Sequence, residues 1–248
     1  MLSILWQIIN VACQLPRSCT NAGIIAITFD DGPTNYTFTI LEIARQNNIK
    51  LTFHFTIHQR MTGDLTDIYK LVIEEGHTLG LRVNPTRDYD NMDYNQVEVD
   101  INKQVCAINK SSGSKIKFAR APEMDSLYNQ DIYTVLYNDN ITQTSANFSV
   151  VGFPDPLKEF EEMICASNPE FDSFIVQMHD SQEENDQYLQ DFINIGLENG
   201  YTFVNLEDCL GDYKPENTSG GNKRSKLSSD GVADICILPL LALLFHIL

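Results

Sequence analysis

Short apolar runs alternate with longer amphipathic stretches from residue 24 to residue 203 of this 248-residue chain. Seven runs have the length of buried strands: 24–29, 51–56, 77–80, 116–119, 141–144, 174–178 and 201–204. Apolar residues recur at helical spacing in the segments between them: 38–46, 67–75, 95–108, 130–137, 157–166 and 185–197. Strands that alternate with helices indicate a parallel sheet with helical crossovers. We therefore predict an α/β fold whose sheet is open or closed into a barrel.

The N-terminal segment 1–13 is apolar apart from three polar residues, and it ends in the small side chains of Val11-Ala12-Cys13. This pattern is typical of a secretory signal peptide. A buried N-terminal strand or helix is the alternative interpretation.

The C-terminal segment 235–245 is apolar, but it is shorter than the roughly 20 residues that a membrane-spanning helix needs. A polar stretch with basic residues at 223–226 precedes it, and the small triplet Ser219-Gly220-Gly221 lies further upstream. This order predicts a GPI-attachment signal with Ser219 as the lipidated residue. A final core helix is the alternative, which Pro239 disfavours.

These two ends divide the chain into a signal peptide at 1–13, a folded domain at 14–213, and a polar spacer with a GPI signal at 214–248. We therefore expect secretion to the cell surface or wall, with GPI anchoring to the plasma membrane. Five Asn-x-Ser/Thr triplets, which are compatible with secretion, begin at Asn35, Asn109, Asn140, Asn147 and Asn217.

Acidic residues outnumber basic ones by 34 to 17, which gives a formal net charge of −17. Nucleic acid would be repelled by this charge, so we expect a neutral or cationic partner instead. Between the presumed signal peptide and the C-terminal signal lie four cysteines: Cys19, Cys106, Cys165 and Cys209. An even number in an oxidising compartment predicts two disulfides, and the spacing leaves all three pairings open.

Polar residues follow three of the strand-like runs: Asp30-Asp31, Arg120 and His179-Asp180. Folds of this class place their sites at such strand ends. Alternation cannot aim two adjacent carboxylates at the same place, so a turn must begin there, and Gly32-Pro33 supplies it. One carboxylate could act as a base, another as a metal ligand, and the histidine as an acid. A strand-to-helix turn with solvated acids is the alternative.

Segment 28–33, Thr-Phe-Asp-Asp-Gly-Pro, resembles the first motif of the polysaccharide deacetylases, carbohydrate esterase family four, which include chitin deacetylases. Further segments resemble the family in the same order, from about Gly23 to Gly211: 50–55, 76–80, 120–122, 176–180 and 209–212. The resemblance implies a distorted (β/α) barrel of about seven parallel strands.

The same resemblance implies a role for each residue that matches a motif. Asp30 corresponds to the general base, Asp31 to a ligand of zinc or cobalt, Arg120 to the residue that orients the base, and His179 to the general acid.

Further positions follow from the resemblance. It implies substrate contacts for Pro122, Phe148 and Met178. It also implies a Cys19–Cys209 disulfide, which leaves Cys106 to pair with Cys165.

The second motif of the family departs from its pattern, because Arg82 and Thr86 stand where two metal-binding histidines belong. Catalytic zinc needs about three protein ligands, which Asp31 alone does not provide. An arginine also brings a fixed positive charge. We therefore predict that Arg82 pairs with Asp31 or Asp30 in the metal's place, and we expect no cofactor unless the protein is active with zinc or cobalt.

Other motifs differ as well. Glu123 replaces an aromatic residue, and in segment 144–148 Asn147 replaces an aspartate that would hold His179 protonated. His54 and His58 could be substitute ligands, but on a strand they would lie about 13 Å apart. We interpret His54 as a packed histidine.

Three functions fit this sequence. The first is a wall-associated chitin deacetylase homologue with little or no hydrolysis and a glycan-binding or structural role. The second is an active chitin deacetylase that releases acetate from N-acetylglucosamine polymers. The third is a surface adhesion domain in which the groove has no role. The expected partner is chitin or partly deacetylated chitin, whose cationic form would suit an acidic protein.

Overall fold

The computed structural model describes residues 15–57, 66–122, 129–180, 183–211 and 213–214. Its strands are β1 (Ile24–Gly32), β2 (Thr52–Phe55), β3 (Thr78–Arg82), β4 (Phe118–Arg120), β5 (Thr142–Gln143), β6 (Phe148–Ser149), β7 (Phe174–His179) and β8 (Thr202–Phe203). Its helices are α1 (Thr37–Gln46), α2 (Thr66–Glu74), α3 (Tyr94–Ser112), α4 (Gln130–Asn138), α5 (Pro156–Cys165), α6 (Glu183–Glu198) and α7 (Leu206–Leu210). The predicted signal peptide, Ser219 and the C-terminal signal lie outside these residues.

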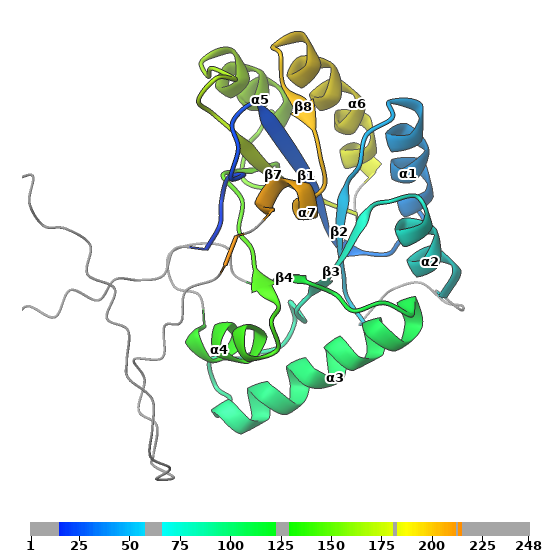
Figure 1. Ribbon diagram of the computed structural model, residues 1–248, viewed down its shortest axis with the longest axis vertical. Coiled ribbons are helices and arrows are strands. Elements are labelled where there is room, and N and C mark those ends of the chain that lie inside the picture. Colours follow the sequence, from blue (N-terminus) through cyan, green and yellow to red (C-terminus); the bar gives the residue numbers. More distant parts are fainter. Residues whose placement is uncertain (1–14, 58–65, 123–128, 181–182, 212, 215–248) are drawn as a thin grey trace, which may run out of the picture. The chain divides into compact units, whose positions relative to one another are not determined.

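All strand pairs are parallel, in the order β5-β4-β3-β2-β1-β7-β6, with β8 paired to the start of β1. Helices α1 to α6 lie around the outside of this curled sheet, as the ribbon in Figure 1 shows. The α/β class and the barrel-like arrangement are therefore confirmed. The sequence patterns missed two short elements, β6 and α7.

A four-residue connection at 144–147 brings the two ends of the sheet together. The Thr144 N–H donates to the Ala119 carbonyl (2.9 Å), which extends the pairing of β5 with β4. Three residues later the Asn147 N–H donates to the Ile175 carbonyl (3.1 Å) on β7. The sheet is thus curled, and its two end strands, β5 and β6, follow each other directly in the chain.

Two apolar layers stabilise the fold. The larger one lies between the sheet and its helices and includes Ile27, Phe29 and Leu81. The smaller one contains Ala26, Phe118, Ile175 and the helix α7. Neighbouring strand residues alternate between the two layers, because side chains along a strand point to opposite faces. A polar side chain on a strand therefore also lies on one of the two faces of the sheet, and its place in the strand decides which one. Within the described residues, no helix is long and apolar enough to cross a membrane.

The disulfide implied by the family resemblance is confirmed: Cys19 and Cys209 are bonded. The second expected disulfide is wrong, because Cys106 and Cys165 are exposed, free thiols. Cys106 lies on α3, which packs beside α2 and α4, whereas Cys165 ends α5, which packs beside α6. A disulfide requires Cα atoms within about 7 Å, and helices on different parts of the sheet do not bring them so close.

Replacing both bonded cysteines by serine should lower the stability strongly, because the bond closes a loop with a sequence separation of 190 residues. Chain entropy puts the loss at up to about 5 kcal/mol. Urea unfolding would measure it, with Cys106→Ser and Cys165→Ser together as the matched control. Equal losses in the two double variants would contradict this assignment.

Candidate functional site

The site is built where β1 ends between β2 and β7. Asp30 is in register with His54 of β2 and with His179 of β7. The pairing with β2 then shifts between Asp30 and Gly32, so that Asp31 forms a bulge with φ of 69°. This bulge lets consecutive carboxylates serve one site. The irregularity in β1 thus begins at Asp31, one residue before the predicted Gly32-Pro33 turn, and Gly32 still pairs with Phe55 of β2.

Residue 32 has to be glycine, because there is no space for a side chain at this position. A Cβ atom on Gly32 would lie 2.2 Å from Oδ2 of Asp180 and 2.8 Å from the Phe55 ring. Asp180 is fully buried and accepts hydrogen bonds from the hydroxyls of Thr34 (2.9 Å) and Thr37 (2.6 Å). The segment after β1 is therefore held to the end of β7, which fixes the carboxylates against His179.

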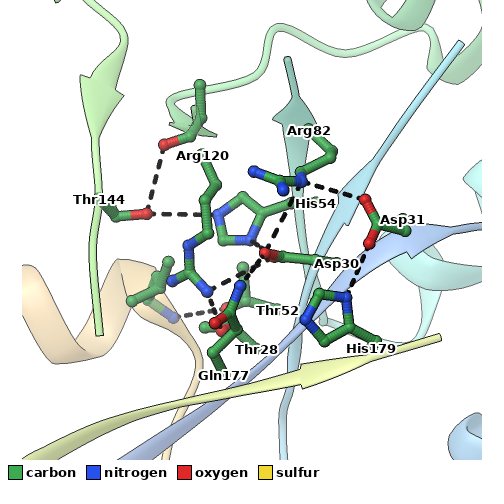
Figure 2. Close-up of polar contacts among 12 residues, drawn as sticks. Thr28, Asp30, Asp31, Thr52, His54, Arg82, Arg120, Thr144, Gln177 and His179 are labelled. Atoms are coloured by element: carbon green, nitrogen blue, oxygen red, sulfur yellow. Dashed lines mark hydrogen bonds and ion pairs between the residues drawn. The ribbon is translucent and has the colours of Figure 1, made fainter. Parts of the chain in front are cut away.

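Asp30 has no exposed surface, and its carboxylate is surrounded by donors (Figure 2). Its Oδ2 accepts from Nε2 of Gln177 (2.6 Å), and its Oδ1 lies 3.0 Å from Nδ1 of His54 and 3.5 Å from Nη1 of Arg120. Burial alone would raise the pKa of Asp30. The guanidinium of Arg120, the His54 hydrogen bond and the charge of Arg82 outweigh burial and hold the pKa far below its usual range. Asp30 is thus a buried, ionised carboxylate.

His54 is fully buried between Asp30 and Thr144. Burial and the nearby Arg120 charge lower the pKa of His54 to about 4, so the imidazole is neutral near pH 7. Since Asp30 is ionised and can only accept, the Nδ1–H of His54 donates a hydrogen bond to Oδ1 of Asp30. The other ring nitrogen, Nε2, lies 3.5 Å from the Thr144 hydroxyl. His54 is therefore packed, as interpreted from the sequence, and it also joins the polar network. His58 lies outside the described residues.

Arg120 crosses the interior from β4 and is fully buried. Its Nη1 donates to the Thr28 hydroxyl (2.9 Å) and its Nη2 to the Ser145 carbonyl (3.1 Å). Burial lowers the pKa of Arg120, and the Asp30 charge opposes that effect. These anchors place the guanidinium beside Asp30.

Arg82 forms the predicted ion pair with Asp31. Its Nε donates to Oδ1 of Asp31 (3.0 Å) and lies 3.9 Å from Oδ2 of Asp30. Its Nη1 donates to the Ala121 carbonyl, and its Nη2 donates to the Pro122 carbonyl (3.2 Å). The guanidinium is thus held on three sides at the end of β3.

The other oxygen of Asp31 contacts His179, with Oδ2 2.7 Å from Nδ1 of the imidazole. Burial would raise the pKa of Asp31, but the His179 hydrogen bond and the Arg82 charge lower it below its usual value. His179 is partly exposed, so this pair lies at the surface end of the site. Figure 2 shows Asp31 between Arg82 and His179.

One of the sequence-based expectations needs correction. Asn147 does not lie beside His179, because its amide bonds the backbone of Ser173 and Ile175 at the start of β7. The carboxylate that accompanies His179 is instead Asp31. Thr86 is exposed, and its hydroxyl donates to Asn84 (2.9 Å). Glu123 lies outside the described residues.

The three residues expected to contact substrate, Pro122, Phe148 and Met178, lie in different surroundings. The Pro122 carbonyl lies at the site through its bond with Arg82. Met178 is wholly buried, and Phe148 packs against the rings of Phe160 and Phe192. The structure therefore places Met178 and Phe148 in the core, where their side chains stabilise the sheet.

Sequence reasoning missed the hydrogen bonds of Thr28 and Gln177 in this network, and it missed the contact of His54 with Asp30. The spacing of Thr28 and Gln177 in the sequence could have revealed them. Thr28 and Gln177 lie two residues before Asp30 and His179, on the same face of otherwise apolar strands. Polar residues at that spacing indicate a buried network that continues beneath the site.

The described part of the chain contains no group of three or more His, Cys, Asp or Glu side chains arranged to hold a metal ion. Among the described residues, the side chains at hydrogen-bonding distance from Asp31 are those of Arg82 and His179.

Residues 17–144 match the family model of the polysaccharide deacetylases, and the chain belongs to this family. It is 29% identical over 200 residues to a bifunctional xylanase/deacetylase of Pseudobutyrivibrio xylanivorans, covering 77% of this chain and 31% of that protein. It is 25% identical over 217 residues to a chitin deacetylase of Colletotrichum lindemuthianum, covering 80% of this chain and 84% of that protein.

Solved structures show the same fold. The chitin deacetylase of Colletotrichum lindemuthianum superposes with a TM-score of 0.71 at 23% identity, covering 82% of this chain and 94% of that one. A CE4 family pseudoenzyme from Bacillus anthracis superposes with a TM-score of 0.64 at 17% identity, covering 77% of this chain and 66% of that one.

The low pKa of His54 predicts an acid-sensitive stability. Between pH 6.5 and about 4 the unfolded chain binds a proton at this imidazole that the folded chain does not. The free energy of unfolding therefore rises with pH across this window, and this contribution to stability decreases as the pH falls from 6.5 to about 4. His54→Asn keeps a donor for Asp30 without the titration, so the slope should fall by up to about 1.4 kcal/mol per pH unit.

Urea unfolding of both proteins at several pH values would measure this difference. His77, whose pKa burial also lowers to about 4, is present in both and contributes equally. Identical slopes for the two proteins would contradict the assignment of the titration to His54.

Proposed function

We propose that this family member binds a chitin-type glycan at the cell surface and hydrolyses it little or not at all. The observation that carries the proposal is the ion pair between Arg82 and Asp31, next to an Asp30 that is buried and hydrogen-bonded at both oxygens. Both carboxylates that the chemistry would use are engaged by side chains of this chain.

The donor set around Asp31 does not fit a divalent metal. Catalytic zinc needs about three nitrogen, sulfur or oxygen ligands with an open position for water. Here a guanidinium lies 3.0 Å from one oxygen of Asp31, and its fixed positive charge would repel a cation. Thr86, at the other position of the motif, is bonded to Asn84. Removing Arg82 alone would therefore not restore the ligands.

The state of Asp30 also argues against hydrolysis. A general base is most effective when its pKa lies near the working pH. Arg120, His54 and Arg82 hold the pKa of Asp30 far below that range. Its two oxygens accept hydrogen bonds from Gln177 and His54 (2.6 and 3.0 Å), and its side chain has no exposed surface at which a water molecule could be activated.

An active deacetylase is the second candidate. The pairing of Arg120 with Asp30 and the position of His179 at the surface end of the site favour it. One relative is a chitin deacetylase, which supports an N-acetylated glycan as the substrate class for either candidate.

The cellular location belongs to the same proposal. The apolar segment 1–13 and the small triplet, polar spacer and apolar tail after Ser219 support secretion and GPI anchoring. A surface location would place the site next to wall glycan, and the domain would then present it outside the plasma membrane.

Acetate release from chitin oligosaccharides is expected to equal the buffer blank, with added zinc or cobalt as well as with a chelator. The chitin deacetylase of Colletotrichum lindemuthianum is the positive control. Metal-dependent release by the wild-type protein would overturn the inactive assignment and establish the second candidate.

The variant Arg82→His with Thr86→His supplies two imidazoles at the motif positions and removes the guanidinium. We expect it to gain metal affinity, because three ligands would then include Asp31. The visible absorption of bound cobalt would detect this binding. Arg82→Gln with Thr86→Gln is the matched control, which removes the cation without supplying ligands, and equal cobalt binding by both would contradict the explanation.

Partly deacetylated oligomers should bind more tightly than fully acetylated ones of the same length. The chain carries a net charge of −17, and opposite charge favours association with a cationic glucosamine polymer. Affinity for the cationic oligomer should fall with added salt. Calorimetric titration would measure both. Equal binding would reject the preference for the cationic oligomer, and absent binding would favour an adhesion domain without glycan affinity.

A further inference from the structure

The side-chain amides of the glycosylation triplets are used very differently by the fold. Asn35 and Asn140 are exposed, and no hydrogen bond to either side chain occurs within the described residues. Asn109 is half-buried, and its Oδ1 accepts from the Ile116 N–H (2.9 Å). Asn147 is exposed but both ends of its amide are bonded. An N-linked glycan is attached through the amide nitrogen, so these differences decide which side chains can carry one.

Asn147 acts as a clamp in the connection that curls the sheet. Its Oδ1 accepts from the Ile175 N–H (2.9 Å), and its Nδ2 donates to the Ser173 carbonyl (3.1 Å). Its own N–H donates to the Ile175 carbonyl (3.1 Å). A sugar on Nδ2 would need space beside the Ser173 carbonyl and would disturb the bonds that bring β6 to β7. The fold and a glycan therefore compete for this side chain.

Asn140 has the opposite character. It follows α4 with φ of 59°, and its backbone N–H donates to the Tyr137 carbonyl (3.0 Å). The backbone is thus fixed while the side chain projects into solvent. Asn has a higher tolerance for this left-handed conformation than most residues. A glycan here displaces no contact of the described residues.

Asn35 combines exposure with proximity to the site. It lies four residues after Asp31, between Thr34 and Thr37, whose hydroxyls both bond Asp180. The turn is therefore held on both sides of an exposed asparagine. A glycan at this position would stand at the edge of the sheet where β1 delivers Asp30 and Asp31.

We propose that Asn35 and Asn140 carry N-linked glycans and that Asn147 does not. The inference rests on the secretory route of the proposed function, because the sugar is transferred in that compartment. Its consequence for the site is steric: a glycan on Asn35 restricts the approach of a polymer from the β1 side.

The test is glycopeptide mass spectrometry of the full chain, produced in a eukaryotic secretory host behind a host leader. Occupied Asn35 and Asn140 with an unmodified Asn147 is the expected result. A glycan on Asn147 of the folded, secreted protein, or empty Asn35 and Asn140, would overturn the proposal.

Asn140→Asp and Asn147→Asp form a matched pair, because the same change abolishes each acceptor. Asn140→Asp should lose the mass of one glycan and keep its Tm, since Asp also tolerates the left-handed backbone. Asn147→Asp should keep its mass and lose Tm, since a carboxylate cannot donate to the Ser173 carbonyl. The reverse pattern would contradict the assignment.

A parallel expression with the chain's own N-terminus separates this inference from the proposed location. Glycans behind the host leader but none with the native N-terminus would reject secretion by segment 1–13 and leave the choice of acceptors intact. Glycans in both would support the two proposals together.

Discussion

The buried charge of Asp30 is the constraint on which the site depends. An ionised carboxylate without exposed surface is costly unless hydrogen bonds and opposite charge compensate it. Gln177, His54 and Arg120 supply that compensation from β7, β2 and β4, with Arg82 of β3 close by. Four strands are thereby tied to one pair of oxygens. The network that stabilises the centre of the barrel is the same one that removes the basicity of Asp30.

Arg82 extends this arrangement to the surface. Where the family pattern has a metal-binding histidine, this chain has Arg82. Its guanidinium pairs with Asp31 and donates hydrogen bonds to the carbonyls of Ala121 and Pro122. Asp31 in turn holds His179. A fixed guanidinium can balance the two carboxylates, but it offers no open coordination position. Ion pairs within the chain thus balance these carboxylates on a polysaccharide deacetylase fold, and the glycan-binding role proposed above rests on this arrangement.

Apolar periodicity predicted the parallel fold, since each long run of buried residues became a strand or a helix. It could not reveal β6, whose two residues are defined by pairing with β7 alone. The pairing of Arg82 with Asp31 followed from charge and motif position. The partner of His179 did not, because the bulge that turns Asp31 toward it depends on φ of 69° at one residue. The role of Asn147 and the free state of Cys106 and Cys165 required three-dimensional neighbours that spacing does not encode.

Metal binding by the unmodified protein tests the central claim most directly. Equilibrium dialysis of the wild-type chain against zinc, with protein-bound metal counted per molecule, addresses the state of Asp31 without requiring a substrate. If Arg82 takes the metal's place, the protein will retain no zinc above the level of a protein without a site. One tightly bound zinc per chain, lost on Asp31→Asn, would contradict the account, because Asp31 would then be a ligand despite its guanidinium partner.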